Sequence, residues 1–226
     1  MTSRLLPRAA AALLGLLAPL CAGCTSEAAP SAASTAASTS STSASTTAGL
    51  PSSAEQLEQL LVQQVPSGLP RVPDDELDPP AGEKTVDDVA RYGDDPAAQR
   101  AVLEDYGYQR GWERFWRSDA ALTSVFVDQF DNVDGAADYA EDLARNDAEY
   151  YDGDLDRSPA DLPEGCVQMT RDEAAPGQGI AGPSAFAWCA AGVFTVAVAA
   201  VAGSPDDART ELVAVTAAQL DRLPTG

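Results

Sequence analysis

Apolar and polar positions follow two different periods in the chain after residue 53. Apolar residues three and four apart predict helices, whereas runs rich in β-branched and aromatic residues predict strands. In chain order, these patterns predict a helix over 54–62, helical structure over 85–106, strands over 107–117 and 122–130, a helix over 133–150, strands over 166–169, 184–191 and 193–202, and a final helix after 204. This order is typical of an α+β domain, and we expect a mainly antiparallel sheet with the helices on one face.

Short polar residues mark the starts of these helices. Serine, threonine and asparagine side chains accept hydrogen bonds from the first free N–H groups of a helix. The predicted caps are Ser53, Thr85, Asn132 or Asp131, and Ser204. In the final helix, Val213, Ala217 and Leu220 are expected to face the sheet.

The run 180–205 carries no charged residue and is long enough for a membrane helix. It also contains Gly182-Pro183, a central Gly192 and β-branched alternation after it, and it lacks leucine. These features favour a buried β-hairpin, with a membrane span as the alternative.

The N-terminus has the layout of an exported lipoprotein. Residues 1–8 carry two arginines, and an uncharged Leu- and Ala-rich stretch follows, which predicts a signal peptide over 1–23. The segment ends in Cys21-Ala22-Gly23-Cys24, which resembles the bacterial lipobox. The resemblance implies that Cys24 receives acyl chains such as palmitate. Two or more chains anchor a protein to a membrane durably, so we expect Cys24 to hold this chain on the outer face of the cytoplasmic membrane. The alternative is cleavage without lipidation, which leaves Cys24 a thiol.

Composition separates a tether from a folded domain. Residues 24–53 are almost entirely Ser, Thr and Ala, so they have too little apolar surface to offset the entropy of ordering. We expect a disordered tether there and one globular domain over 54–226.

Charge and residue usage exclude several functions. The chain has 14 basic and 35 acidic residues, a net charge of −21, which disfavours nucleic acid as a partner. It contains no histidine, which excludes histidine-based catalysis. Lys84 is the one lysine, so a Ser–Lys mechanism has a single candidate. We therefore expect no enzymatic activity, no catalytic residue and no cofactor.

Two cysteines, Cys166 and Cys189, remain in the predicted domain. In an oxidising compartment such a pair predicts a disulfide, here between neighbouring strands or a strand and its flanking loop. Two free thiols or a redox pair are the alternative, although the pair lacks the C-x-x-C spacing.

A strand rich in aromatic residues and arginine is the leading candidate for a ligand surface. It contains Tyr108, Arg110, Trp112, Arg114 and Trp116. Aromatic rings stack on ligands, and arginines pair with carboxylates or phosphates, so a glycan, a peptide or an anionic cell-wall fragment would suit it. The alternative is a core-facing strand whose arginines balance nearby acids.

A weak metal candidate lies at Asp152, Asp154 and Asp156, whose alternating carboxylates match the start of a calcium loop. Arg157 replaces the turn glycine, and Pro163 stands where a bidentate glutamate belongs. An acidic surface loop is the alternative.

The layout resembles that of acidic, Ala-rich actinobacterial lipoproteins. The matching features are the lipobox ending at Cys24, the Ser/Thr tether, Trp112 to Trp116 before 125–130, and Gly135-Ala136-Ala137. More remotely the chain is similar to mycobacterial lipoproteins and kinase sensor domains with an extracellular sheet-plus-helix fold. The resemblance implies a non-enzymatic binding or sensing domain in the cell envelope, with an unknown envelope ligand or protein as partner. A structural lipoprotein that docks another envelope protein and a calcium-dependent domain are the alternatives.

Overall fold

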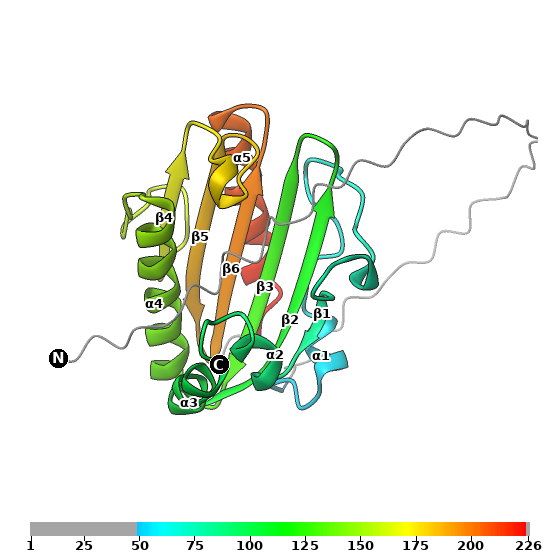
Figure 1. Ribbon diagram of the computed structural model, residues 1–226. Helices are drawn as coiled ribbons and strands as arrows, with labels where there is room; N and C mark the ends of the chain where they lie inside the picture. Colours follow the sequence, from blue (N-terminus) through cyan, green and yellow to red (C-terminus); the bar gives the residue numbers. More distant parts are fainter. Residues whose placement is uncertain (1–48, 225–226) are drawn as a thin grey trace, which may run out of the picture.

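Six antiparallel strands form one sheet in the computed structural model, which describes residues 49–224 (Figure 1). The strand order is β1-β2-β3-β6-β5-β4. The strands are β1 (Gly82–Lys84), β2 (Tyr108–Arg117), β3 (Leu122–Phe130), β4 (Cys166–Arg171), β5 (Ser184–Ala191) and β6 (Phe194–Val201). The predicted signal peptide, Cys24 and the tether up to residue 48 lie outside the described residues.

Five α-helices and two short 3-10 helices accompany the sheet in the described part of the chain. They are α1 (Ala54–Glu58), η2 (Asp74–Glu76), α2 (Val86–Ala90), α3 (Pro96–Tyr106), α4 (Val133–Tyr151), η3 (Pro176–Gln178) and α5 (Pro205–Leu220). Ser53, Thr85, Asn132 and Ser204 each accept a hydrogen bond from a backbone N–H of the first helical turn, so these predicted caps are confirmed. The α+β class is confirmed as well, and the predicted elements follow in the predicted order, with the short strand β1 as an addition.

Helices cover both faces of the sheet, so the predicted single helical face is wrong. Figure 1 shows α4 in front of the sheet and α5 behind it, and both helices contact β5 and β6. The reason lies in the strands, because β5 and β6 bury residues of both parities. A strand without a polar face needs apolar cover on each side.

The uncharged run 180–205 forms the β5–β6 hairpin and its flanks, as the β-branched alternation predicted. Val193 and Gly192 lie in the two-residue turn, and Gly192 has a φ of 58°. Among residues 49–224, no helix has the length and hydropathy that a membrane crossing requires.

Helix α5 buries a different stripe from the predicted one. Val213 and Ala217 are only partly buried, whereas Ala208, Leu212 and Val215 are fully covered by the sheet and its surroundings. The apolar residues of α5 are spread around the helix, so their spacing alone does not identify the buried side.

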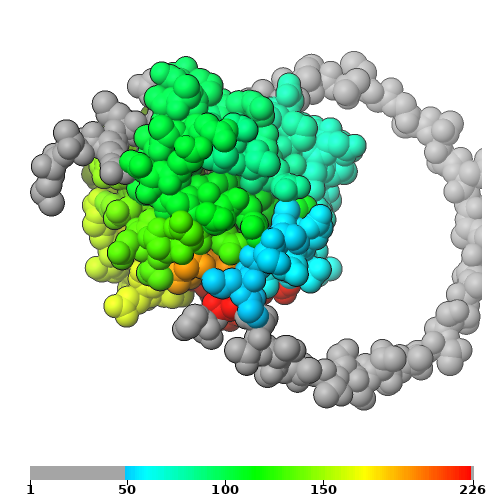
Figure 2. Space-filling view, turned by 90° about the horizontal axis from the view of Figure 1, so that it is seen from below, coloured from blue at the N-terminus to red at the C-terminus, as the bar shows by residue number. Residues whose placement is uncertain are grey.

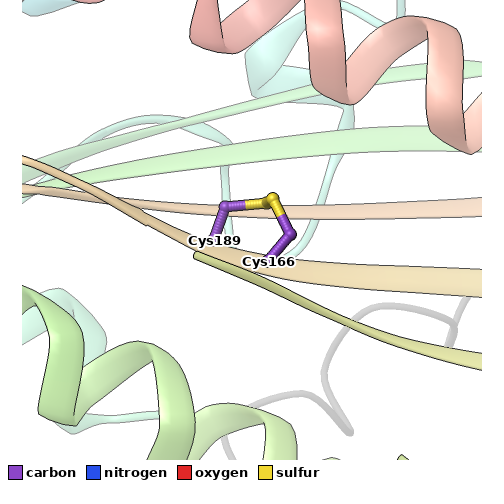
Figure 3. The surroundings of a disulfide bond; sticks show 2 residues. All are labelled: Cys166 and Cys189. Carbon is purple, nitrogen blue, oxygen red and sulfur yellow. A yellow bond between two sulfur atoms is a disulfide. The ribbon is translucent and has the colours of Figure 1, made fainter. Parts of the chain in front are cut away.

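The predicted disulfide is confirmed. Cys166 and Cys189 lie directly opposite each other on β4 and β5, with their Cα atoms 4.0 Å apart. Figure 3 shows the bond on the face of the sheet that carries α5. A bond that closes a loop of this length stabilises a fold by about 3 kcal/mol in the chain-entropy model.

Candidate functional site

A cleft lies on the α4 face of the sheet, above the small residues of the central strand β6. Two alanines of β6 have larger neighbours on both sides: Ala197 pairs with Phe126 and Trp188, and Ala199 pairs with Ser124 and Phe186. Because alanine side chains are short, they leave space above β6 between the larger side chains of β3 and β5. The Phe186 and Trp188 rings are stacked, with centroids 6.0 Å apart, and form one wall.

Helices close the cleft from above. The residues that cover it are Val89 of α2, Tyr92, which follows α2, and Tyr139, Leu143 and Asp147 of α4. The three residues from α4 are spaced four apart, so they lie on one side of that helix. The cleft holds about 640 Å³ of empty space, including the solvent at its open mouth. We call this space the central cleft.

Glu113 occupies one end of the central cleft and is 5% exposed. Its carboxylate forms an ion pair with Lys84 (3.2 Å) and accepts a hydrogen bond from the Tyr92 hydroxyl (2.8 Å). Burial raises the pKa of Glu113 to about 7, although Lys84 and Tyr92 act in the opposite direction. The single lysine of the chain is therefore held at the edge of the cleft by a buried acid.

Asp128 lies beside Glu113 and is 8% exposed. Burial raises its pKa to about 7, the neighbouring Tyr108 hydroxyl and Lys84 ammonium lower it, and the nearby Glu113 raises it further. The strand next to it carries Gly111 at the paired position. A Cβ atom at Gly111 would collide with the Asp128 carboxylate and the Tyr108 hydroxyl. The glycine therefore makes room for this buried acid.

Asp147 projects from α4 toward the aromatic wall and is 5% exposed. The Trp188 indole N–H donates to its Oδ2 atom at 3.2 Å. Burial raises the pKa of Asp147 to about 8, and this hydrogen bond is the opposing influence. A carboxylate can accept several hydrogen bonds. Asp147 has one donor, whereas Glu113 has two partners, Lys84 and Tyr92.

Ser124 adds a hydroxyl to the lining. Its side chain is fully buried, and its Oγ atom has no hydrogen-bond partner. Buried polar atoms are nearly always hydrogen-bonded, to protein or to another molecule. The cleft thus combines aromatic walls with three buried acids and a hydroxyl that is free to bond a ligand.

None of the five residues of the predicted ligand strand lines the central cleft, although Tyr108 lies next to Asp128. Arg114 and Trp116 are 0% and 1% exposed and face away from the central cleft, beneath α1 and the chain that follows it. Arg114 donates to the Val62 carbonyl (2.9 Å) and pairs with Glu58 (3.0 Å). Arg110 donates to the Pro51 carbonyl (2.9 Å), the Tyr108 ring packs edge-on against Phe130, and Trp112 is partly buried.

The segment 51–65 therefore packs over Arg110, Arg114 and Trp116 of β2. It is also joined to the C-terminal helix region, because Gln219 and Arg222 donate to the Leu60 carbonyl. Figure 2 shows the blue atoms of this segment beside the red C-terminal ones. Binding of a ligand to Trp112, Arg114 and Trp116 stays a prediction, and it requires this segment to move.

The acidic loop after α4 has structural roles. Asp152 ends the helix with a φ of 52°, and Asp156 accepts a hydrogen bond from the Ser158 N–H (2.9 Å). No group of three or more Asp, Glu or Cys residues within residues 49–224 is arranged to hold a metal ion. Calcium binding by Asp152, Asp154 and Asp156 stays a prediction.

No protein family matches the chain, and no curated protein does. One solved structure is similar, the extracellular domain of PknH from Mycobacterium tuberculosis. It is 17% identical, with a TM-score of 0.38, over 55% of this chain and 69% of that one.

Proposed function

We propose that this chain is a non-enzymatic binding domain of the cell envelope, and that the central cleft is its ligand site. The observation that carries the proposal is the lining itself. Asp147, Asp128 and Ser124 are buried in an aromatic-walled space with fewer protein partners than their polar atoms accept. Burial of such groups destabilises a fold unless something compensates for it, and a bound ligand would do so.

Binding is favoured over catalysis by the chemistry of the lining. A serine nucleophile needs a general base within hydrogen-bond reach, and the Ser124 hydroxyl has no partner at all. The Lys84 ammonium is engaged in an ion pair with Glu113 (3.2 Å) and is not a partner of the Ser124 hydroxyl. The absence of histidine from the chain removes the commonest acid–base residue.

Two features support a location in the cell envelope. They are the signal-peptide and lipobox pattern of residues 1–24 and the disulfide between Cys166 and Cys189. Disulfides persist in oxidising compartments, which agrees with export of the domain. The lipid anchor is tested by membrane fractionation of the Cys24→Ala variant. We expect the wild-type chain in the membrane fraction and the variant in the soluble one, and equal partition of both would contradict the anchor.

Ligand binding is tested by NMR on a soluble chain, residues 24–226 with Cys24→Ala. The protein has three tryptophans, and their indole N–H signals report on opposite sides of the sheet. We expect small organic compounds to shift the Trp188 signal saturably and to leave Trp112 and Trp116 unchanged, because only Trp188 lines the cleft.

A pair of variants sharpens this test. Ala197→Phe fills the floor of the cleft and should abolish binding, whereas Ala218→Phe places the same side chain at an exposed position of α5. Unchanged Trp112 and Trp116 signals show that each variant is folded. Equal binding by wild type and Ala197→Phe, or no shift of Trp188 with any compound, would refute the cleft as the ligand site.

A further inference from the structure

The charges of the central cleft do not balance. Three carboxyl groups line it, from Glu113, Asp128 and Asp147, and one basic side chain, Lys84, reaches any of them. Lys84 pairs with Glu113 alone. When the acids are ionised, these groups therefore carry two more negative charges than positive ones. A ligand that completes this site carries positive charge, since desolvated charges in a protein interior are normally paired.

We propose that the central cleft binds an organic cation, an ammonium group carried on a small apolar body. This inference deepens the proposed binding function and rests on it. It depends on two independent features of the cleft, the unpaired carboxylates and the aromatic wall. The fully buried, unpartnered Ser124 hydroxyl is a further sign that a polar ligand group belongs there.

The aromatic side chains suit such a ligand. Trp188 is the residue type that binds cations most strongly through its ring face, and it lies in the wall with Phe186 and opposite Phe126. The Asp147 carboxylate meets the indole edge of Trp188, so a negative charge and a ring stand side by side. An ammonium group in this corner would contact both. The two alanines of β6 leave room below for the apolar part of the ligand.

Other ligand classes fit the lining less well. An anion would meet the unpaired acids and be repelled by them. A metal ion needs converging ligands, and none of the Asp, Glu or Cys residues in the described part of the chain form a group of three suited to one. A neutral apolar compound would fill the space but leave the carboxylates unpaired.

The test compares choline with 3,3-dimethylbutan-1-ol, which has the same shape with carbon in place of the charged nitrogen. Both are titrated into the soluble chain while the Trp188 indole signal is followed. The titration is run at pH 8.5, because burial raises the pKa of Asp147 to about 8 and the acid must be ionised. We expect choline to bind at least tenfold more tightly than its neutral analogue. Trp112 and Trp116, on the opposite face, provide internal controls.

Two matched variants locate the charge that matters. Asp147→Asn keeps the shape and the hydrogen bond from Trp188 but removes the charge, and it should weaken choline binding at least tenfold without affecting the alcohol. Asp119→Asn makes the same charge change at an exposed position after β2 and should leave binding unchanged.

The outcomes separate this inference from the proposed function. Equal binding of both probes, or binding of neutral compounds alone, would overturn the cation inference while leaving the cleft as a ligand site. Equal effects of Asp147→Asn and Asp119→Asn would also overturn it, because the attraction would then reflect overall charge. A Trp188 signal that no compound shifts would overturn both proposals.

Discussion

The two faces of the sheet treat buried charges differently. On the α5 face, the Glu211 carboxylate accepts hydrogen bonds from the Ser67 N–H (2.9 Å), the Ser67 hydroxyl (2.6 Å) and the Thr123 hydroxyl (3.1 Å). Arg114 is likewise bonded to a carboxylate and a carbonyl. On the α4 face, the Asp147 carboxylate accepts a hydrogen bond from the Trp188 indole (3.2 Å). The Glu211 carboxylate thus has three protein donors, whereas the Asp147 carboxylate has one.

The difference indicates separate roles for the faces. A buried charge with several protein partners holds elements together, here segment 51–65, β2, β3 and α5. A buried charge with few partners weakens the fold unless a ligand completes it. We therefore expect substitutions on the α5 face to lower stability and substitutions on the α4 face to alter binding.

The largest effect is expected from the disulfide on the α5 face. The double variant Cys166→Ala/Cys189→Ala removes a covalent link between β4 and β5, and its free energy of unfolding should fall by about 3 kcal/mol. Urea unfolding of both proteins measures the difference. Ligand-induced shifts of Trp188 should persist in the folded variant, because the bond lies on the far side of the sheet from the cleft. Loss of binding with full retention of stability would invert the roles assigned to the two faces.

Much of this fold could be predicted from local pattern. Caps such as Ser53 and Thr85 mark helix starts through bonds made within a few residues, so sequence alone is enough to find them. The strand β3 was predicted with its observed bounds because β-branched and aromatic residues are concentrated in a short stretch. The second helical face was missed, since burial of a strand on both sides depends on which elements later cover it.

The central cleft was missed because its residues come from strands and helices far apart in the chain. Local signals for it do exist. Glu113 and Asp128 are acids inside strands that are otherwise largely apolar or aromatic, and Asp147 continues the helical stripe of Tyr139 and Leu143 at intervals of four. An acid on a buried stripe is a recognisable sign of a site. Sequence alone could not show that Ala197 lies between Phe126 and Trp188, because this depends on the register of three strands.

A smaller effect, with a distinctive pH dependence, is expected at Asp147. Burial raises its pKa to about 8, whereas an unfolded aspartate titrates near 3.9. The folded state then binds more protons than the unfolded state between these values, so the contribution of Asp147 to stability falls as pH rises from about 4 to about 8. Trp188, Tyr139 and Tyr151 are the neighbours that influence this site, and both tyrosines have raised pKa values and stay neutral.

The Asp147→Asn variant removes this titration. We expect it to match wild type at pH 5 and to be more stable by roughly 1–2 kcal/mol at pH 8.5, since each pH unit is worth at most about 1.4 kcal/mol per group and relaxation reduces the total. Urea unfolding at both pH values measures the effect. Glu113 and Asp128 titrate in both proteins and cancel in the comparison. Parallel pH profiles would show that water or another donor already solvates Asp147.

The smallest effects compare two neighbours on β3 whose side chains point to opposite faces. Thr123 and Ser124 are both buried to within 1% exposure, but Thr123 donates to Glu211 at 3.1 Å and Ser124 has no partner. Removal of a hydroxyl that bonds a buried carboxylate destabilises a fold by about 1 kcal/mol or more, so Thr123→Val should lower the free energy of unfolding by that amount. Ser124→Ala removes an unpartnered hydroxyl and should change it by less than about 0.5 kcal/mol in either direction. Chemical unfolding of the two single variants gives the comparison directly. Equal losses would mean that Ser124 is bonded in solution, and its hydroxyl would then no longer support a ligand in the central cleft.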